Sequence, residues 1–362
     1  MFDFTLRGDK GNPAIRIDLV AGLFIGVAIV ALTLGFNNVN GWGVLRATDA
    51  APFTILGLSP APLLIVVGVV FGQLFWAWTR RRMREGKPSL IDLSILDGAQ
   101  ERAAVAAMFV VVGLEACVNF SIPLYIQIVQ GRTPFDTSLA MMPFNLTVFV
   151  TATLVVRFYK RYPPRVIGVF GFTLTTVALV WLAFVVTNNW ETLPTILGLF
   201  VFGVGQGALV TLVFNVLVTA APKRLAGDVG SIRGTTQNLA SAVGTAVAGA
   251  LLVTILGIGV GRAVTEHPEL PPSLVAQVDL DNVNFVSNDD LRSVLDGTDA
   301  TPAQVDAAVE VNEDARLDTL RLGLLILGGV SATAILPASR LPRYRPDEIP
   351  DPSPAAGPDP SR

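Results

Sequence analysis

Residues 103–131 read AAVAAMFVVVGLEACVNFSIPLYIQIVQG, and Glu115 is the only charged residue among them. A helix needs about 20 predominantly apolar residues to cross a hydrocarbon core roughly 30 Å thick. A helix at the surface of a soluble domain would carry polar or charged side chains along its outer face. This stretch has no such face. The sequence therefore predicts a transmembrane helix, in which the backbone polar groups satisfy one another.

Seven further stretches contain no charged residue and are long enough to cross a membrane. They are Leu19–Leu45, Ala50–Thr79, Thr137–Val156, Val166–Trp190, Thr192–Pro222, Gly234–Gly261 and Leu322–Ser339. The composition agrees with this pattern, because 51% of the chain is hydrophobic and only 15% is charged, whereas globular domains hold about 25% charged residues. The prediction is an all-α polytopic membrane protein with eight transmembrane helices.

The basic residues are distributed unequally between the two sides of the predicted membrane. If the spans alternate, 20 of the 26 lysines and arginines lie on the side of the N-terminus and six on the other side. Because short cytoplasmic loops carry an excess of basic residues, both termini are predicted to be cytoplasmic. The predicted domains are a cytoplasmic segment 1–18, two helices within 19–79, a basic cytoplasmic loop 80–102, a six-helix unit 103–339 with an extracytoplasmic loop 262–318, and a disordered cytoplasmic tail 340–362.

Two connections carry local signals. Residues 188–191 (NNWE) predict a tight hairpin, so the spans on either side of it should be antiparallel neighbours. The acidic loop 262–318 contains Thr301 before Pro302, which is typical of a helix start. A short surface helix over Ala303–Val311 is therefore predicted. It either caps an outer vestibule or belongs to a solvated connector.

Glu115 is the candidate proton-coupling residue, because it is the only acid in the middle of a predicted span. An ionised side chain at that depth costs about 2.5–3.5 kcal/mol on insertion scales and usually faces a bundle interior or a water-filled cavity. Loss of water favours the protonated form of a carboxyl group. Asn119 lies one turn further along the same face and is placed to hydrogen-bond it. The alternative is a structural carboxylic acid bonded to a neighbouring helix.

Further amides lie inside the spans and are candidates for lining a substrate cavity. They are Gln127, Asn145, Gln206, Asn215, Gln237 and Asn238. For each of them, joining two helices is an equally good interpretation. The glycines of the sixth and seventh spans, Gly203, Gly205, Gly207, Gly227, Gly230, Gly234, Gly244 and Gly249, predict close approach of neighbouring helix backbones.

Several chemistries are excluded by what the sequence contains. Gly203-Val-Gly205 lies inside an apolar span rather than after a strand, and no Gly-x-x-x-x-Gly-Lys-Ser/Thr phosphate loop occurs. With one histidine (His267) and one cysteine (Cys117), a His/Cys zinc site cannot form. The chain is accordingly predicted to be no enzyme, to hold no metal or other cofactor, and to bind no nucleic acid.

The order of several motifs resembles the fourteen-span drug:proton antiporter branch of the major facilitator superfamily. These motifs are Gly41-Trp-Gly43, residues 88–94 (PSLIDLS), 123–127 (PLYIQ), 130–136 (QGRTPFD), 141–143 (MMP), 227–234 (GDVGSIRG), 237–244 (QNLASAVG) and 340–345 (RLPRYR). The resemblance implies that 19–79 forms the two linker helices of that branch and that 103–339 forms its C-terminal six-helix half. It also implies a basic cytoplasmic latch at Arg157, Lys160, Arg161 and Arg165, where the leading Gly and Asp of the family's inner-loop motif are absent.

The resemblance implies proton-coupled efflux of small amphipathic or cationic molecules across a bacterial cytoplasmic membrane. It covers residues 17 to about 350 and includes no N-terminal six-helix half, so the chain is expected to be incomplete as a transporter. It could be a truncated reading frame, a half completed by a partner chain, or a homo-oligomer. The alternative from another class is a membrane interaction protein that regulates a transporter. The expected partners are the lipid bilayer and a small-molecule substrate, whose identity the sequence does not give.

Overall fold

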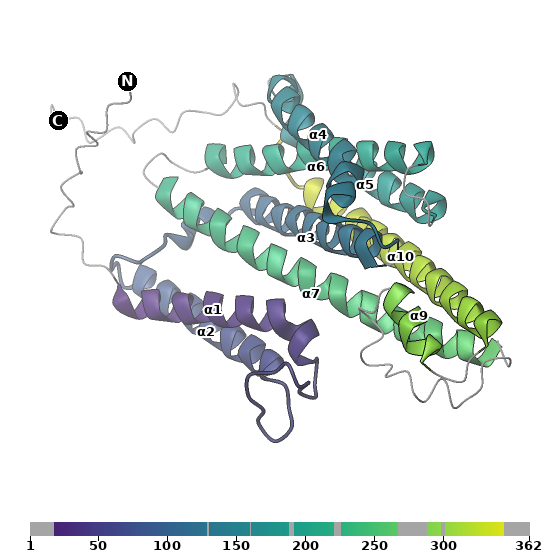
Figure 1. The fold of residues 1–362 in the computed structure, drawn as a ribbon. Coiled ribbons are helices and arrows are strands. Elements are labelled where there is room, and N and C mark those ends of the chain that lie inside the picture. Colours follow the sequence, from purple (N-terminus) through teal and green to yellow (C-terminus); the bar gives the residue numbers. More distant parts are fainter. Residues whose placement is uncertain are drawn as a thin grey trace, which may run out of the picture.

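The computed structural model describes residues 18–128, 130–159, 161–187, 192–220, 226–266, 288–297 and 301–343. Eight long helices account for most of these residues (Figure 1): α1 (Leu19–Trp42), α2 (Pro60–Arg84), α3 (Ala99–Ile128), α4 (Pro134–Tyr159), α5 (Pro164–Val185), α6 (Leu193–Ala220), α7 (Ala226–Glu266) and α10 (Pro302–Ala338). A 3₁₀ helix, η1 (Leu93–Leu96), and the short α9 (Asn288–Asp296) complete them. The predicted all-α fold is confirmed.

Seven of the long helices, all except α7, are long and apolar enough within the described residues to cross a membrane. The 41-residue α7 contains the eighth predicted span, Gly234–Gly261, and its side chains are described only as far as Leu252. The polytopic class is therefore confirmed. The helices also run beyond the uncharged stretches, because α2 continues to Arg84 and so takes up part of the segment that was expected to be a basic loop.

Helices α1 and α2 form an antiparallel hairpin that lies beside α7 (Figure 1). Each of the two begins with a side-chain cap: the Asp18 carboxylate accepts the Ala21 N–H at 3.1 Å, and the Ser59 hydroxyl accepts the Ala61 N–H at 3.2 Å. The helices approach closely at Gly68, where a β-carbon would lie 2.6 Å from Cγ of Leu32. Small residues permit such contact in a membrane, where helix association depends on packing rather than on escape from water.

The other six long helices form a bundle with two buried apolar clusters. One cluster contains Phe144 and Phe202, whose rings stack with their centroids 5.2 Å apart. The second contains Phe172 and Leu212, and η1 contributes Ile95 to it. The segment between α2 and α3, which contains η1, therefore packs into the interior of the bundle through Ile95. The expected pairing of the fifth and sixth spans is confirmed, because α5 and α6 pack along each other.

The expected close approach at glycines is correct for some positions and wrong for others. A β-carbon at Gly207 of α6 would lie 2.6 Å from the Val148 carbonyl oxygen of α4, and one at Gly203 would lie 2.8 Å from the Phe144 carbonyl oxygen. Gly205 packs against Thr175 of α5, Gly244 against Gly113 of α3, and Gly249 against Asn40 of α1. By contrast, Gly227, Gly230 and Gly234 have no atom within 4 Å of such a β-carbon. These three glycines lie on an open face of α7, whereas Val229 and Ile232 of the same segment are buried in the second apolar cluster.

The short surface helix predicted over Ala303–Val311 is wrong, because these residues are the first turns of α10, which continues unbroken to Ala338. The predicted helix start at Pro302 is correct, and the Thr301 N–H donates to Oε1 of Gln304 at 2.9 Å. At the other end, Leu341 and Pro342 are buried against the bundle, so the first residues of the predicted disordered tail are packed. The tail beyond residue 343 lies outside the described residues.

Candidate functional site

Glu115 lies near the middle of α3 and is half-buried in the bundle. Within the part of the chain that the structure describes, its carboxylate makes no hydrogen bond and no ion pair. No described cation offsets its charge, so in a membrane the neutral, protonated form is favoured. A carboxyl group in this situation is able to exchange a proton when its access to water changes.

Asn119, one turn further along α3, is exposed. No hydrogen bond joins it to Glu115 among the described residues, so the expected contact between the two side chains is not formed. Asn119 therefore does not hold the Glu115 carboxyl group in this conformation. Whether it takes part in proton coupling remains a separate prediction.

Four of the six candidate cavity amides are exposed on the surface of the described helices, and one is half-buried. The exposed ones are Gln127, Asn145, Gln237 and Asn238, and Asn215 is half-buried. Asn145 and Asn238 donate to carbonyl oxygens one turn earlier in their own helices, at 3.2 and 2.9 Å. A small apolar pocket between α3, α7 and α10 is lined by other residues, including Ser121 and Thr319. The amides thus lie on outer faces rather than around this pocket.

Gln206 differs from the other five amides. It is fully buried in α6, and neither its side-chain oxygen nor its nitrogen has a hydrogen-bond partner within the described residues. The hydroxyl of Thr175, which packs against the neighbouring Gly205, is also buried without a described partner. An unsatisfied buried polar group costs about 1–3 kcal/mol. Among the predicted cavity amides, Gln206 is therefore the one whose buried side-chain oxygen and nitrogen both lack a described hydrogen-bond partner.

Three of the four residues of the predicted basic latch, Arg157, Arg161 and Arg165, are described, at the end of α4 and the start of α5. Arg157 and Arg161 are exposed, and Lys160 lies outside the described residues. The Arg165 backbone N–H donates to the Pro342 carbonyl oxygen at 3.2 Å, which ties the start of α5 to the segment after α10. The Arg161 backbone N–H donates to the Phe158 carbonyl oxygen at 2.9 Å, so the described hydrogen bonds of the latch residues are made by backbone groups.

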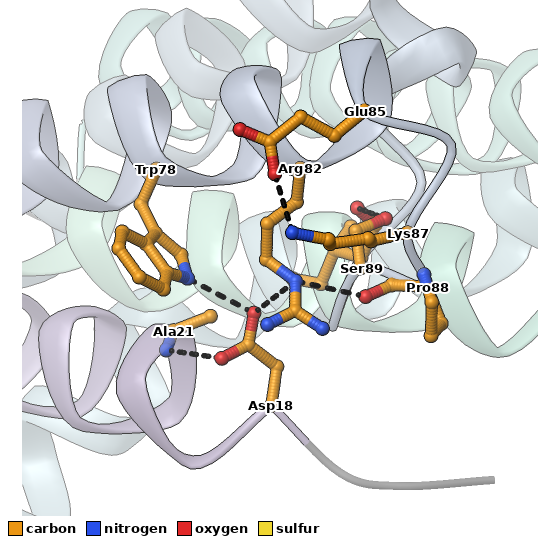
Figure 2. Close-up of polar contacts among 9 residues, drawn as sticks. Asp18, Ala21, Trp78, Arg82, Glu85, Lys87, Pro88 and Ser89 are labelled. Atoms are coloured by element: carbon orange, nitrogen blue, oxygen red, sulfur yellow. Dashed lines mark hydrogen bonds and ion pairs between the residues drawn. The ribbon is translucent and has the colours of Figure 1, made fainter.

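A polar cluster that the sequence analysis missed closes the open end of the α1–α2 hairpin (Figure 2). One oxygen of the Asp18 carboxylate caps α1, and the other accepts from Nε1 of Trp78 at 3.0 Å and lies 3.1 Å from Nε of Arg82. The Asp18 side chain is 3% exposed and that of Arg82 is 24% exposed. The Arg82 Nε also donates to the Pro88 carbonyl oxygen at 3.1 Å. This cluster, the Asp18 knot, joins the start of α1, the end of α2 and the following turn.

The sequence contained a signal for the Asp18 knot. Two antiparallel helices of 24 and 25 residues place the start of the first beside the end of the second. An acid directly before the first span and a basic residue after the second are then brought together. Opposite charges at matched ends of a predicted hairpin are therefore a usable indication of such a contact.

A second polar cluster joins α9 to α10 at the far end of the bundle. Nδ2 of Asn288 donates to Glu313 at 2.7 Å, and the buried Asn312 donates to Asn288 at 3.2 Å. Arg321 donates to the carbonyl oxygen of Val186, which follows the last turn of α5, at 3.0 Å. Cations and donors at a helix C-terminus satisfy its last carbonyl groups. These contacts fix the polar part of α10 against the bundle.

Comparison with known proteins gives a family match and several curated relatives. The family described as Major Facilitator Superfamily matches residues 19–245. The chain is 28% identical over 227 residues to the protein named "Multidrug efflux pump LfrA" of Mycolicibacterium smegmatis, covering 61% of this chain and 42% of that protein. It is 27% identical over 275 residues to the "Probable actinorhodin transporter" of Streptomyces coelicolor, covering 71% and 44%. The chain spans less than half the length of these curated relatives.

Proposed function

We propose that this chain, which belongs to the Major Facilitator Superfamily, takes part in secondary transport, namely the proton-coupled efflux of small amphipathic or cationic molecules. The match to the family over residues 19–245 carries this proposal. One relative is named a multidrug efflux pump, which supports the proposed direction of transport, and a second is named a probable actinorhodin transporter, which supports a small-molecule substrate. A multi-pass location in a bacterial cytoplasmic membrane fits the organisms of these relatives.

Within the family, we assign the chain to the fourteen-span branch. In this assignment α1 and α2 are the linker pair, and α3 to α7 together with α10 are the C-terminal six-helix unit. Two observations support it. The hairpin is separate in its packing and touches the bundle mainly through α7, whereas the six other helices share two apolar clusters.

Transport by this unit requires a second six-helix bundle. Transporters of this kind work by moving one half against the other around a site at the membrane midplane. The exposed amides Asn119, Gln127, Asn145, Gln237 and Asn238 support this view, because each would be poorly solvated by hydrocarbon. A protein surface or a water-filled cavity would satisfy them. This unit, expressed without a second six-helix bundle, should therefore give cells no drug tolerance, and co-expression of a complementary bundle should restore it.

Glu115 is proposed as the proton-coupling residue. Its half-buried carboxyl group without a described partner is the residue-level support for that role. The test is Glu115→Gln in the chain reconstituted with a complementary half. The amide keeps the shape of the side chain, so insertion should be unchanged, but it carries no exchangeable acid proton. Dye efflux driven by a pH gradient should then be lost.

Glu310→Gln, at an exposed position in the polar part of α10, is the matched control and should transport normally. If Glu115→Gln transports as well as the parent with the same pH dependence, Glu115 is a structural residue. If transport needs ATP and ignores the proton gradient, the proposed class is wrong.

We also propose that both termini are cytoplasmic, on the basis of the 20-to-six distribution of basic residues. The native Cys117 is buried, so introduced cysteines can be read against a low background. In intact cells an impermeant thiol reagent should label Ser287→Cys and leave Ser94→Cys, in η1, unlabelled. The reverse pattern would require the opposite orientation.

A further inference from the structure

The last turns of α2 carry aromatic and basic side chains on two opposite faces. Residues four apart lie above one another on a helix, and residues two apart point in nearly opposite directions. Trp78 and Arg82 therefore share one face, and Trp76, Arg80 and Arg84 share the other. The first face is occupied by the Asp18 knot (Figure 2). The second face has no such partner within the described residues.

On this outer face the basic side chains form an open, positively charged hollow. Arg80, Arg81 and Arg84 line a hollow of about 500 Å³ together with Ala77 and Glu85. The Arg80 guanidinium carbon lies 4.7 Å from the centre of the Trp76 ring, an arrangement that orients the cation.

The charge of this hollow is only partly compensated. Glu85 is its one carboxylate, and it is shared by Arg81 at 3.0 Å and Lys87 at 2.7 Å. In the part of the chain that the structure describes, neither Arg80 nor Arg84 is paired with an acid. Two guanidinium groups are thus available to an anion.

The same face of α2 continues into the apolar part of the helix. Val66 and Val69 lie on it, about three to four turns before Arg80, and are 59% and 46% exposed. Trp76 lies between the apolar and the basic residues, the position that tryptophan prefers at a membrane–water interface. The hollow is therefore at the depth of lipid headgroups, and the surface beside it suits an acyl chain.

We propose that Arg80 and Arg84 bind the phosphate group of an anionic phospholipid whose acyl chain lies along Val66 and Val69. Guanidinium groups donate two parallel hydrogen bonds to phosphate oxygens. The choline group of phosphatidylcholine is itself a cation, which the arginines of the hollow would repel. Phosphatidylglycerol and cardiolipin carry no such cation and therefore fit the hollow. Basic residues at the cytoplasmic end of a membrane helix bind anionic lipid in this way. The site lies on the hairpin and is independent of the proposed transport activity.

The test is lipid retention by the purified full chain in detergent micelles, measured by native mass spectrometry after exposure to phosphatidylglycerol, cardiolipin or phosphatidylcholine. The parent should retain the two anionic lipids and not phosphatidylcholine. The double variant Arg80→Gln, Arg84→Gln should retain about thirtyfold less anionic lipid, because each basic residue near the surface contributes about 1 kcal/mol. Both residues are exposed, so its thermal unfolding should match that of the parent.

The matched control is Arg340→Gln, Arg343→Gln, which removes the same charge from two other exposed arginines and should retain lipid normally. An equal loss in this control would overturn the proposal by showing that overall charge decides retention. Full retention by the Arg80 and Arg84 variant would also overturn it. Displacement of phosphatidylglycerol by inorganic phosphate would identify a site for free phosphate rather than for lipid.

Discussion

The α1–α2 hairpin and helix α6 are both membrane helices, but they are held in different ways. Of the residues in an 18-residue apolar stretch of α6, 61% are buried inside the protein, whereas in the corresponding stretch of α2 only 17% are buried. Helix α6 is held by side-chain packing on several sides. Within the hairpin, α1 and α2 pack closely at Gly35 and Gly68 and are joined by the Asp18 knot at their open end, whereas the hairpin meets the rest of the protein mainly through α7. In a membrane, the burial of side chains fixes the position of a helix inside the bundle, whereas a helix at the edge of the bundle also depends on a few polar contacts.

The largest expected effect is on the packed side of this comparison. Gly207→Leu should disrupt the contact of α6 with α4, because the new β-carbon would lie 2.6 Å from a backbone oxygen that cannot turn away. We expect a loss of about 3 kcal/mol or more of unfolding free energy. The measurement is thermal unfolding in detergent.

Gly329→Leu is the control for this change, because nothing lies within 4 Å of a β-carbon at that position in α10. Its stability should equal that of the parent. Equal stability of the two variants would show that packing at α6 is looser than described.

The next effect concerns the hairpin. Asp18→Ala removes the acceptor of three groups and leaves the partly buried Arg82 without its carboxylate, so we expect a loss of about 2 kcal/mol. The loss should be confined to the hairpin. Hydrogen exchange should accelerate in the first turn of α1 and the last turns of α2, while α5 and α6 stay protected. Uniform acceleration throughout the chain would mean that the hairpin and the bundle unfold as one unit.

A smaller effect is expected where the hairpin meets the bundle. Nδ2 of Asn40 in α1 donates to the Ala246 carbonyl oxygen of α7 at 3.4 Å, a long hydrogen bond. Asn40→Ala should cost about 0.6 kcal/mol, a typical value for polar contacts between membrane helices. A cysteine pair at Asn40 and Gly249 should report this contact by cross-linking. A pair that never cross-links in membranes would place the hairpin elsewhere.

The smallest effect is expected at the exposed end of α2. A hydrogen bond from Lys87 and a second from Arg81 lower the pKa of the Glu85 carboxyl group. A lowered pKa in the folded state stabilises the fold above the ordinary carboxyl range, and this contribution is lost as the pH falls through the folded pKa. Glu85→Gln should therefore barely change unfolding at neutral pH and should remove a slight acid sensitivity. A large effect would contradict the exposed position of this cluster.

The sequence was sufficient to find the helices, because charge is excluded from the hydrocarbon core. It did not show which side of each helix faces the bundle. Lipid-facing and protein-facing positions are both apolar, so Phe149, 70% exposed, and Phe144, 1% exposed, look alike in sequence. For the same reason it did not separate the buried Gln206 from the exposed Gln237. It also predicted a separate helix before the last span, because a polar segment can continue a membrane helix without any break in the backbone.

The unbroken course of α10 has a mechanical consequence. Its 37 residues form a rod about 55 Å long. Near its first end, α10 contacts α9 through the hydrogen bond between Glu313 and Asn288. Its last end leads directly to Leu341 and Pro342, which pack against and accept a hydrogen bond from the start of α5. Because the helix is continuous, a displacement of its α9 end would be passed on, at least in part, to the segment that contacts the start of α5. The polar contacts of α9 and the start of α5 are thus joined by a single continuous helix.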